Sequence, residues 1–421
     1  MRGVRSARVG AAAAAALVAL MGCGGGSDDS SATDADEVTV VVNAPFSGAP
    51  YVARMIANGV QLGIETAGDS DEPGVFSAGE HTYRLRMVKL DSELSPRQAL
   101  RNVRRAAADG ALAVIDEGTG VDASWEVARD ADLPVGIVYQ GGPGLVDEER
   151  RPNVFRIVPR DRGVAFRLAE YLVPKRLKLA ILHDDTGYGR EGAEALRAAF
   201  ELNPEAIASA VTVSAGQSDL APQVLRAKRS GATALLVWAR GPTIAAVLTA
   251  ARSRGWDVPV YTAPAGADPV VRQQLADHPE WVDGLTFASG RMAAEGGPTS
   301  FEAFQTLYVE AFGADDVGVR ARDGQRVLQP PEYAMYPYDF VHLLVAAVRL
   351  AGGAEDRAKV VEALNNVVVE GANGDERSFN RRNHEAVIDD DVYFARFEDM
   401  TYRPVQDDPL SATLPVVPQV R

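Results

Sequence analysis

The stretch from Leu177 to Phe200, LKLAILHDDTGYGREGAEALRAAF, constrains the fold of this chain more than any other. It opens with the apolar run Leu177 to Leu182, which is typical of a strand buried on both faces of a parallel sheet. A turn rich in Asp and Gly follows, and apolar residues then recur at helical spacing from Ala193 to Phe200. A strand, a loop and a helix in this order are half of a βαβ unit. Tyr188, at the start of the helix, is therefore expected at the carboxyl end of the sheet, where open α/β sheets bind ligands.

The same stretch contains the pattern G-x-G-x-x-G at Gly187 to Gly192. In dinucleotide-binding folds the first Gly follows the strand directly, and an acidic residue ends the next strand about 20 positions on. Here His183 to Thr186 intervene, and the next strand candidate, Ile207 to Val213, is followed by Ser-Ala-Gly. The pattern therefore does not predict a nucleotide site, and we expect no cofactor.

Strand and helix candidates alternate along most of the chain, which predicts an α/β protein with two doubly wound, Rossmann-like lobes. The strand candidates are Glu37 to Asn43, His81 to Leu90, Ala111 to Ile115 and Pro134 to Val138 in a first series, and Leu177 to Leu182, Ile207 to Val213, Ala232 to Val237 and Val258 to Thr262 in a second. Residues 153–161 and 284–288 break the rhythm and are interpreted as crossings between the lobes.

The expected N-terminal lobe comprises residues 38–157 with about 290–388, and the C-terminal lobe comprises residues 158–289 with about 389–421. The last part of the chain is expected to add a helix from Tyr338 to Ala351 and strands near Val387 to Ile388 and Val392 to Phe397.

Residues 1–22 have the features of a secretory signal peptide, with three Arg before an apolar run, Val9 to Met21, that is too short to span a bilayer. The run ends in Leu-Met-Gly-Cys, which resembles the bacterial lipobox, in which the Cys receives a lipid. We therefore expect lipidation at Cys23, although a stray Cys after an ordinary signal is the alternative. Residues 23–37 are almost free of apolar side chains and are interpreted as a flexible tether.

Charge and motif content exclude several classes of function. Removing residues 1–22, which carry three Arg and no acidic residue, lowers the net charge from −15 to −18. Such an acidic body argues against nucleic acid as a partner, and against adhesion to an anionic membrane surface through charge. The sequence has no G-x-S-x-G, P-loop or H-E-x-x-H motif, and its five His residues are scattered. We therefore do not expect an enzyme or a metal site.

Several short motifs, taken in order, resemble the type I periplasmic solute-binding proteins of ABC importers, in particular the leucine/isoleucine/valine-binding branch. They are Phe46-Ser47-Gly48, Leu90-Asp91, Leu133-Pro134-Val135, Phe155 to Pro159, Asp184 to Gly189, Val237 to Pro242 and Tyr338-Asp339. The resemblance implies two lobes joined by three crossover segments, which close like a hinge on a small polar solute such as an amino acid, amide or carboxylate. It also implies a receptor held at the membrane through the lipid on Cys23 and partnered by ABC permease subunits. A lipoprotein that senses the solute and signals to a membrane partner without transport is the alternative.

The resemblance also implies a set of ligand-binding residues, which come from the loops that follow the strands. The loop after the third strand offers hydroxyl groups and backbone amides to a ligand carboxylate, and the loop after the fourth adds backbone contacts. Tyr188 matches an aromatic lid, and the segment 238–241 matches a wall of the site. The expected residues are Ser47, Tyr51, Glu117, Thr119, Gly120, Tyr139, Gln140, Gly141, Tyr188, Trp238, Arg240 and Ala265.

Each of these side chains also has a purely structural interpretation. Tyr188 could cover the first turn of its helix, Trp238 could belong to the core, and Arg240 could be a surface residue. Asp116 and Glu117 could cap the helix that follows them.

One position departs from the pattern of the family. Amino-acid binders of this group place an acidic residue after the strand equivalent to Val258 to Thr262, where it pairs with the ligand ammonium. Ala265 stands there in this chain. Because a buried ammonium without a carboxylate is costly, either another acid substitutes or the ligand has no α-amine. The candidates for the substitute are Asp116, Glu117, Asp184 and Asp268, whereas Arg240 favours a ligand with a carboxylate.

Overall fold

The computed structural model describes residues 35–414, except 291, 293–296, 315, 321–325 and 388–390. The expected signal peptide and Cys23 lie outside the described residues. The first strand begins at Asp36, within the last residues of the expected tether. Within the described ranges, no helix combines the length and the apolar character that crossing a bilayer requires.

The first sheet has the strand order β2-β3-β1-β4-β5-β6. Its strands are β1 (Asp36–Ala44), β2 (Val75–Ala78), β3 (His81–Asp91), β4 (Ala113–Asp116), β5 (Val135–Ile137) and β6 (Val154–Arg156). All neighbours are parallel except β2, which forms an antiparallel hairpin with β3. The buried apolar run Val40 to Val42 explains why β1 lies inside the sheet. Because β3 and β4 flank β1 on opposite sides, the chain reverses its winding there, and this reversal creates a crevice at the carboxyl ends of β1 and β4.

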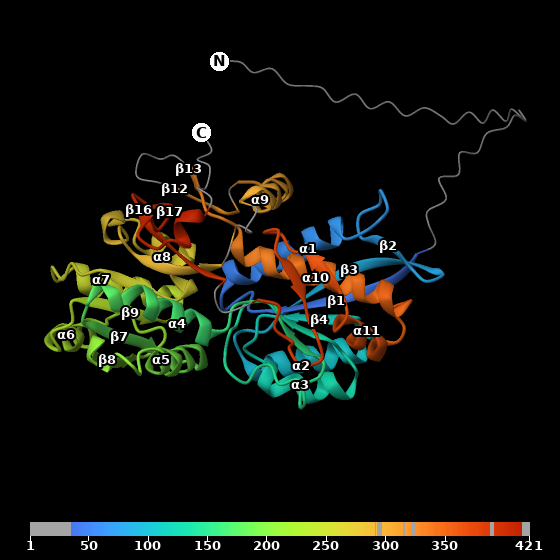
Figure 1. Cartoon of the computed structure of the whole chain (residues 1–421), viewed down its shortest axis with the longest axis horizontal. Coiled ribbons are helices and arrows are strands. Elements are labelled where there is room, and N and C mark those ends of the chain that lie inside the picture. Colours follow the sequence, from blue (N-terminus) through green and yellow to red (C-terminus); the bar gives the residue numbers. More distant parts are fainter. Residues whose placement is uncertain are drawn as a thin grey trace, which may run out of the picture. The chain divides into compact units, whose positions relative to one another are not determined.

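The helices of the first lobe are α1 (Pro50–Thr66), α2 (Pro96–Ala108), α3 (Val121–Asp130), α9 (Thr299–Phe312), α10 (Glu332–Ala351) and α11 (Arg357–Leu364). Ser95 caps α2, since its hydroxyl accepts a hydrogen bond from the Gln98 amide. Helices α1 and α10 lie side by side (Figure 1). Their backbones come so close that a Cβ on Gly59 would lie 2.2 Å from the Ala334 carbonyl oxygen. This contact ties a late segment of the chain to the first lobe.

The second sheet has the order β17-β16-β11-β10-β9-β7-β8. Its strands are β7 (Leu179–Asp184), β8 (Ile207–Val213), β9 (Ala234–Trp238), β10 (Val260–Thr262), β11 (Thr286–Gly290), β16 (Val392–Glu398) and β17 (Thr401–Pro404), and its helices are α4 (Asp161–Leu172), α5 (Gly187–Ala199), α6 (Ala221–Arg229), α7 (Gly241–Arg252) and α8 (Pro269–Gln274). Strands β7 to β11 are parallel, and β16 and β17 are antiparallel. The winding reverses at β7, between β8 and β9, so this sheet has a crevice of its own at the carboxyl ends of β7 and β9.

The predicted α/β class with two doubly wound sheets is confirmed. Helix α10 begins six residues before the predicted Tyr338, because Pro337 lies inside the helix rather than at its start. Three features were not predicted: the hairpin of β12 (Gly318–Arg320) and β13 (Arg326–Leu328), the hairpin of β14 (Val368–Glu370) and β15 (Glu376–Ser378), and strand β17. Val387 is buried but outside any strand, and Ile388 lies outside the described residues.

Candidate functional site

Loops from both sheets line one large cleft, which we call the outer cleft. It contains about 1190 Å³ of empty space, counting the solvent at its mouth. The first lobe contributes residues 48–52, Arg54 and Tyr139, and the second contributes Asp184, residues 240–243, Ala265 and residues 268–270. These segments lie at the carboxyl ends of the strands, which is where open α/β sheets bind ligands.

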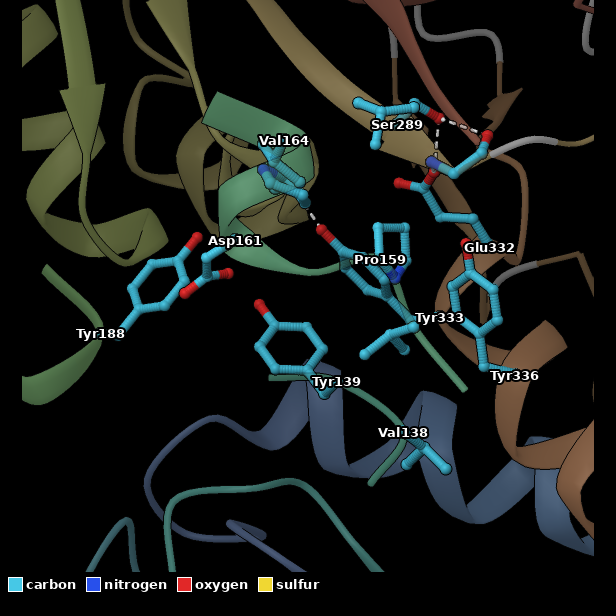
Figure 2. Close-up of a pocket in the computed structure, with 14 residues that line it drawn as sticks. Val138, Tyr139, Pro159, Asp161, Val164, Tyr188, Ser289, Glu332, Tyr333 and Tyr336 are labelled. Atoms are coloured by element: carbon cyan, nitrogen blue, oxygen red, sulfur yellow. Dashed lines mark hydrogen bonds between the residues drawn. The ribbon is translucent and has the colours of Figure 1, made fainter. Parts of the chain in front are cut away.

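A second, smaller space lies next to the segment that crosses from β6 to α4, and we call it the tyrosine chamber (Figure 2). It contains about 580 Å³ of empty space, counting its opening. Its polar lining comes chiefly from Tyr139, Asp161, Tyr188, Glu332, Tyr333 and Tyr336. Tyr139 also lines the outer cleft, so the two spaces adjoin at this side chain. Its ring packs edge-on against Tyr333 with centroids 5.3 Å apart.

The Glu117 carboxylate is the centre of a hydrogen-bond network at the end of β4. Its Oε2 accepts bonds from the Thr119 amide, at 3.1 Å, and from the Thr119 hydroxyl, at 2.6 Å. Its Oε1 accepts a bond from Gln140 Nε2, at 3.1 Å, and lies 3.5 Å from Nη2 of Arg240. Burial opposes the charge on Arg240, yet the neighbouring Glu117 carboxylate raises the pKa of its guanidinium. Three residues that were expected to contact the ligand, Thr119, Gln140 and Arg240, therefore have their side chains beside a carboxylate of the protein itself.

Two of the acids considered as partners for a ligand ammonium organise loops instead. Asp116 accepts bonds from Asn43 Nδ2, at 2.6 Å, and from the Gly118 amide, at 2.7 Å, so it fixes the ends of β1 and β4. Asp184 accepts a bond from the Arg240 amide, at 3.1 Å, and holds the turn before α5 through Thr186. The buried Asp184 thereby links the turns that follow β7 and β9.

Asp268, the remaining candidate, lines the outer cleft and caps α8 by accepting a bond from the Val270 amide, at 2.9 Å. Burial raises the pKa of its carboxyl, and Arg272 and Arg240 partly oppose that shift. Asp268 is thus an acid that faces the cleft three positions after Ala265.

Two acids that the sequence did not single out line the tyrosine chamber. Burial raises the pKa of Asp161 to about 7, although the charge of Arg156 works against the shift. Burial likewise raises the pKa of Glu332 to about 7, although bonds from Ser289, at 2.5 Å, and from the Gly290 amide, at 3.2 Å, favour its charged form. Asp161 is the first residue of α4 and Glu332 is the first residue of α10, and both side chains line the chamber.

Several expected residues line one of the two spaces, while others stand behind them. Tyr51, Arg240 and Ala265 line the outer cleft, Tyr188 lines the tyrosine chamber, and Tyr139 lines both. The Ser47 amide bonds to Asp91 at 3.2 Å. Gly120 precedes α3 where that helix meets α2, since a Cβ there would lie 2.0 Å from Cβ of Ala99. Gly141 stands directly behind Asp161, since its Cβ would lie 2.5 Å from the Asp161 amide nitrogen.

Trp238 is fully buried and supports the site from beneath. Its ring lies 5.9 Å from that of Tyr188, measured between centroids. A Cβ on Gly192 would lie 2.2 Å from the Trp238 ring, and a Cβ on Gly189 would lie 2.2 Å from the Asp184 carbonyl oxygen. Gly189 and Gly192 of the G-x-G-x-x-G pattern thus let α5 pack closely on β7 and β9, which accounts for these two glycines without a nucleotide.

Comparisons with known proteins agree with this architecture. A family model described as periplasmic binding protein matches residues 37–401. An amino acid binding protein of Pseudomonas aeruginosa is 25% identical over 337 residues, which is 75% of this chain and 80% of that protein. The Leu/Ile/Val-binding protein homolog 3 of Brucella melitensis is 25% identical over 342 residues, which is 80% of this chain and 84% of that protein.

Solved structures show the same fold. A type 1 periplasmic binding protein from Bordetella pertussis superposes with a TM-score of 0.74 at 19% identity, covering 88% of this chain and 99% of its own. A leucine binding protein from Thermotoga maritima gives a TM-score of 0.70 at 19% identity, covering 87% of this chain and 97% of its own. The family match extends over most of the chain, and the expected resemblance is confirmed. The chain therefore belongs to the periplasmic binding protein family and has the fold of its type I members, which makes it a solute-binding protein rather than an enzyme.

Proposed function

We propose that the protein is an extracytoplasmic receptor that captures a small polar solute between its lobes and delivers it to the permease subunits of an ABC importer. The observation that carries the proposal is that loops from the two winding reversals, one in each sheet, line the same cleft, which shares Tyr139 with the tyrosine chamber. The names of the relatives support a solute of the amino-acid kind. The resemblance found in the sequence adds amides and carboxylates to the classes to be tested.

Capture proceeds by closure of the lobes about their crossover segments, as in other hinged binding proteins. The segment from Arg156 to Asp161 is the crossover that the structure describes in full, and it forms one wall of the chamber. Closure shields the polar contacts of the solute from water, which strengthens them.

A lipid on Cys23 and the tether of residues 23–37 hold the receptor at the membrane while the folded part stays mobile. Expression of the full chain with Cys23→Ser tests this anchor, because the variant should leave the membrane fraction. Retention of the variant on membranes would contradict a lipid anchor at this position.

A melting screen of amino acids, amides and carboxylic acids tests solute capture, because a bound solute raises the melting temperature by an amount that grows with the logarithm of its concentration divided by its Kd. Tyr188→Ala should abolish the shift given by a hit, while Phe166→Ala, a change on the exposed face of α4, should preserve it. An unchanged affinity in Tyr188→Ala would refute the placement of the site. Uptake of the hit by cells that carry the permease genes distinguishes import from sensing.

A further inference from the structure

We propose that the solute is an organic amine, with an apolar body and no carboxylate next to its ammonium group, and that the ammonium binds in the tyrosine chamber between Asp161 and Glu332. This inference rests on the proposed receptor function, and it replaces the amino-acid class of solute, which the names of the relatives support, by an amine. It starts from the charges of the chamber and from the donors that are already occupied in the outer cleft.

The chamber is acidic and aromatic. Among the described residues that line it, Asp161 and Glu332 carry ionisable carboxyl groups, and no Lys, Arg or His is present. Ser289 and four tyrosines, Tyr139, Tyr188, Tyr333 and Tyr336, also line it. In Figure 2 Asp161 lies beside Tyr188, and Glu332 lies on the other side of the chamber, above Tyr336. Carboxylates together with the faces of aromatic rings are the groups that bind an organic cation in a desolvated site.

One oxygen of the Glu332 carboxylate is available to accept a hydrogen bond from such a cation. The residue is 2% exposed, and its Oε2 receives the bonds from Ser289 and Gly290. Its Oε1 has no hydrogen-bond partner among the described residues. In Figure 2 this second oxygen points away from Ser289 and toward the middle of the chamber. A buried carboxylate oxygen without a donor is costly, and a ligand N–H would remove that cost.

The outer cleft, by contrast, is poorly suited to a ligand carboxylate. Two Arg side chains line it among the described residues, and each already faces an acid. Arg54 pairs with Asp316 at 2.7 Å, and Arg240 faces Glu117 at 3.5 Å. Thr119 and Gln140 also donate to Glu117. An incoming carboxylate would have to displace the carboxylate of Glu117 and would be repelled by it, whereas an amine has no such competitor.

An alternative role for Asp161 and Glu332, as protonated hydrogen-bond donors, predicts that affinity changes with pH in the opposite direction. If Asp161 and Glu332 acted as protonated donors to a carboxylate solute, affinity would fall as pH rises and the donors are lost. If they act as carboxylates toward an ammonium, affinity rises over the same range, because burial places the pKa of both acids near 7 while a simple aliphatic amine stays protonated. The sign of the pH dependence therefore decides between the readings without any variant.

The experiment compares two amines with the amino acids that differ from them by an added α-carboxylate. The pairs are 3-methylbutylamine with leucine, and tyramine with tyrosine. Titration calorimetry on the full folded protein at pH 6 and pH 8 should give tighter binding of at least one amine than of its amino acid, by about tenfold or more. The affinity of that amine should be higher at pH 8. Asp161→Asn and Glu332→Gln should each weaken it by about tenfold or more, and the control Glu126→Gln, an exposed acid on α3, should not.

If leucine and tyrosine both bind at least as tightly as their amines, the amine proposal is overturned and the receptor function is left intact. Affinity that falls from pH 6 to pH 8 would overturn it as well. Because both tests use the wild-type protein, they hold even if a variant fails to fold. If no amine, amino acid, amide or carboxylic acid raises the melting temperature, the proposed receptor function fails together with this inference.

Discussion

Glu117 and Arg240 meet across the cleft, with Nη2 of Arg240 3.5 Å from Oε1 of Glu117. Glu117 directly follows β4 of the first sheet, and Arg240 stands two residues after β9 of the second. The Glu117 side chain is 1% exposed and that of Arg240 is 20% exposed, so the pair is largely shielded from water. The two winding reversals, where α/β sheets bind ligands, are thereby joined by a charge pair belonging to the protein.

Replacing Glu117 by Gln should change the selectivity of the site toward carboxylates. The substitution removes the negative charge and frees Arg240 for a charge-assisted bond to a ligand carboxylate. We expect the affinity for 4-methylpentanoate to rise by about tenfold relative to that for 3-methylbutylamine, measured by calorimetry. Arg240→Gln in the Glu117→Gln background serves as the control, because it should cancel the gain. An unchanged ratio in Glu117→Gln would show that the pair does not govern carboxylate binding.

The raised pKa of Asp161 should appear in the pH dependence of stability of the ligand-free protein. An acid with a pKa of about 7 in the folded state, against an ordinary value of 3.8, binds its proton more firmly when folded. Its presence therefore costs progressively more stability as pH rises from the unfolded pKa to about 7. Asp161→Asn removes this cost, so its stability relative to wild type should increase from pH 5 to pH 8. Urea unfolding at four pH values checks the slope, and a difference that shrinks with pH would contradict the assignment.

Sequence patterns predicted the scaffold because its rules are local. Parallel strands that are buried on both faces are recognisable as apolar runs in the sequence, as the run Leu177 to Leu182 shows for β7. Tyr188 was placed near the cleft because the loops that follow parallel strands gather at one edge of a sheet. The family resemblance placed Tyr51, Tyr139 and Arg240 there.

The chamber could not be predicted in this way, because its walls come from segments far apart in the chain. Asp161 follows a crossover segment that has no periodic pattern, and Glu332 starts a helix whose first turns are hidden by Pro337. No local rule brings these two acids together. The role of Glu117 was also hidden, since a carboxylate at a strand end has several possible partners and tertiary contacts select among them.

Gly192→Ala should destabilise the protein through the contact between α5 and the second sheet. The new Cβ would lie 2.2 Å from the ring of Trp238, which is fully buried and has no room to move away. We expect a loss of about 1–3 kcal/mol in the free energy of unfolding, measured with urea. Gly187→Ala, on the same helix, is the matched control, because its Cβ would have its nearest neighbour at 3.8 Å. Equal effects of the two substitutions would argue against close packing as the reason for Gly192.

Asp339→Ala should be among the most destabilising substitutions in the first lobe. Asp339 and Arg377 are 0% and 2% exposed, and Oδ2 of Asp339 lies 3.1 Å from Nε of Arg377. Oδ1 of Asp339 also accepts a bond from the Ala372 amide at 2.7 Å. Removing the carboxylate leaves a buried guanidinium without its closest counter-charge and an amide without its acceptor. We expect a loss of about 3–5 kcal/mol in the free energy of unfolding.

Two control variants distinguish the destabilisation caused by an unpaired buried charge from the net contribution of the Asp339–Arg377 ion pair to stability. Asp109→Ala breaks the exposed pair with Arg105 on α2 and should cost about 0.2–1 kcal/mol at most. The double substitution of Asp339 by Leu and Arg377 by Met removes both charges and fills their space with apolar atoms. Because the desolvation of both ions is then avoided, the double variant should be more stable than Asp339→Ala. If the double variant is less stable than Asp339→Ala, the remaining bonds of Arg377, including the one to Asn373 Oδ1 at 3.0 Å, contribute more than its desolvation costs.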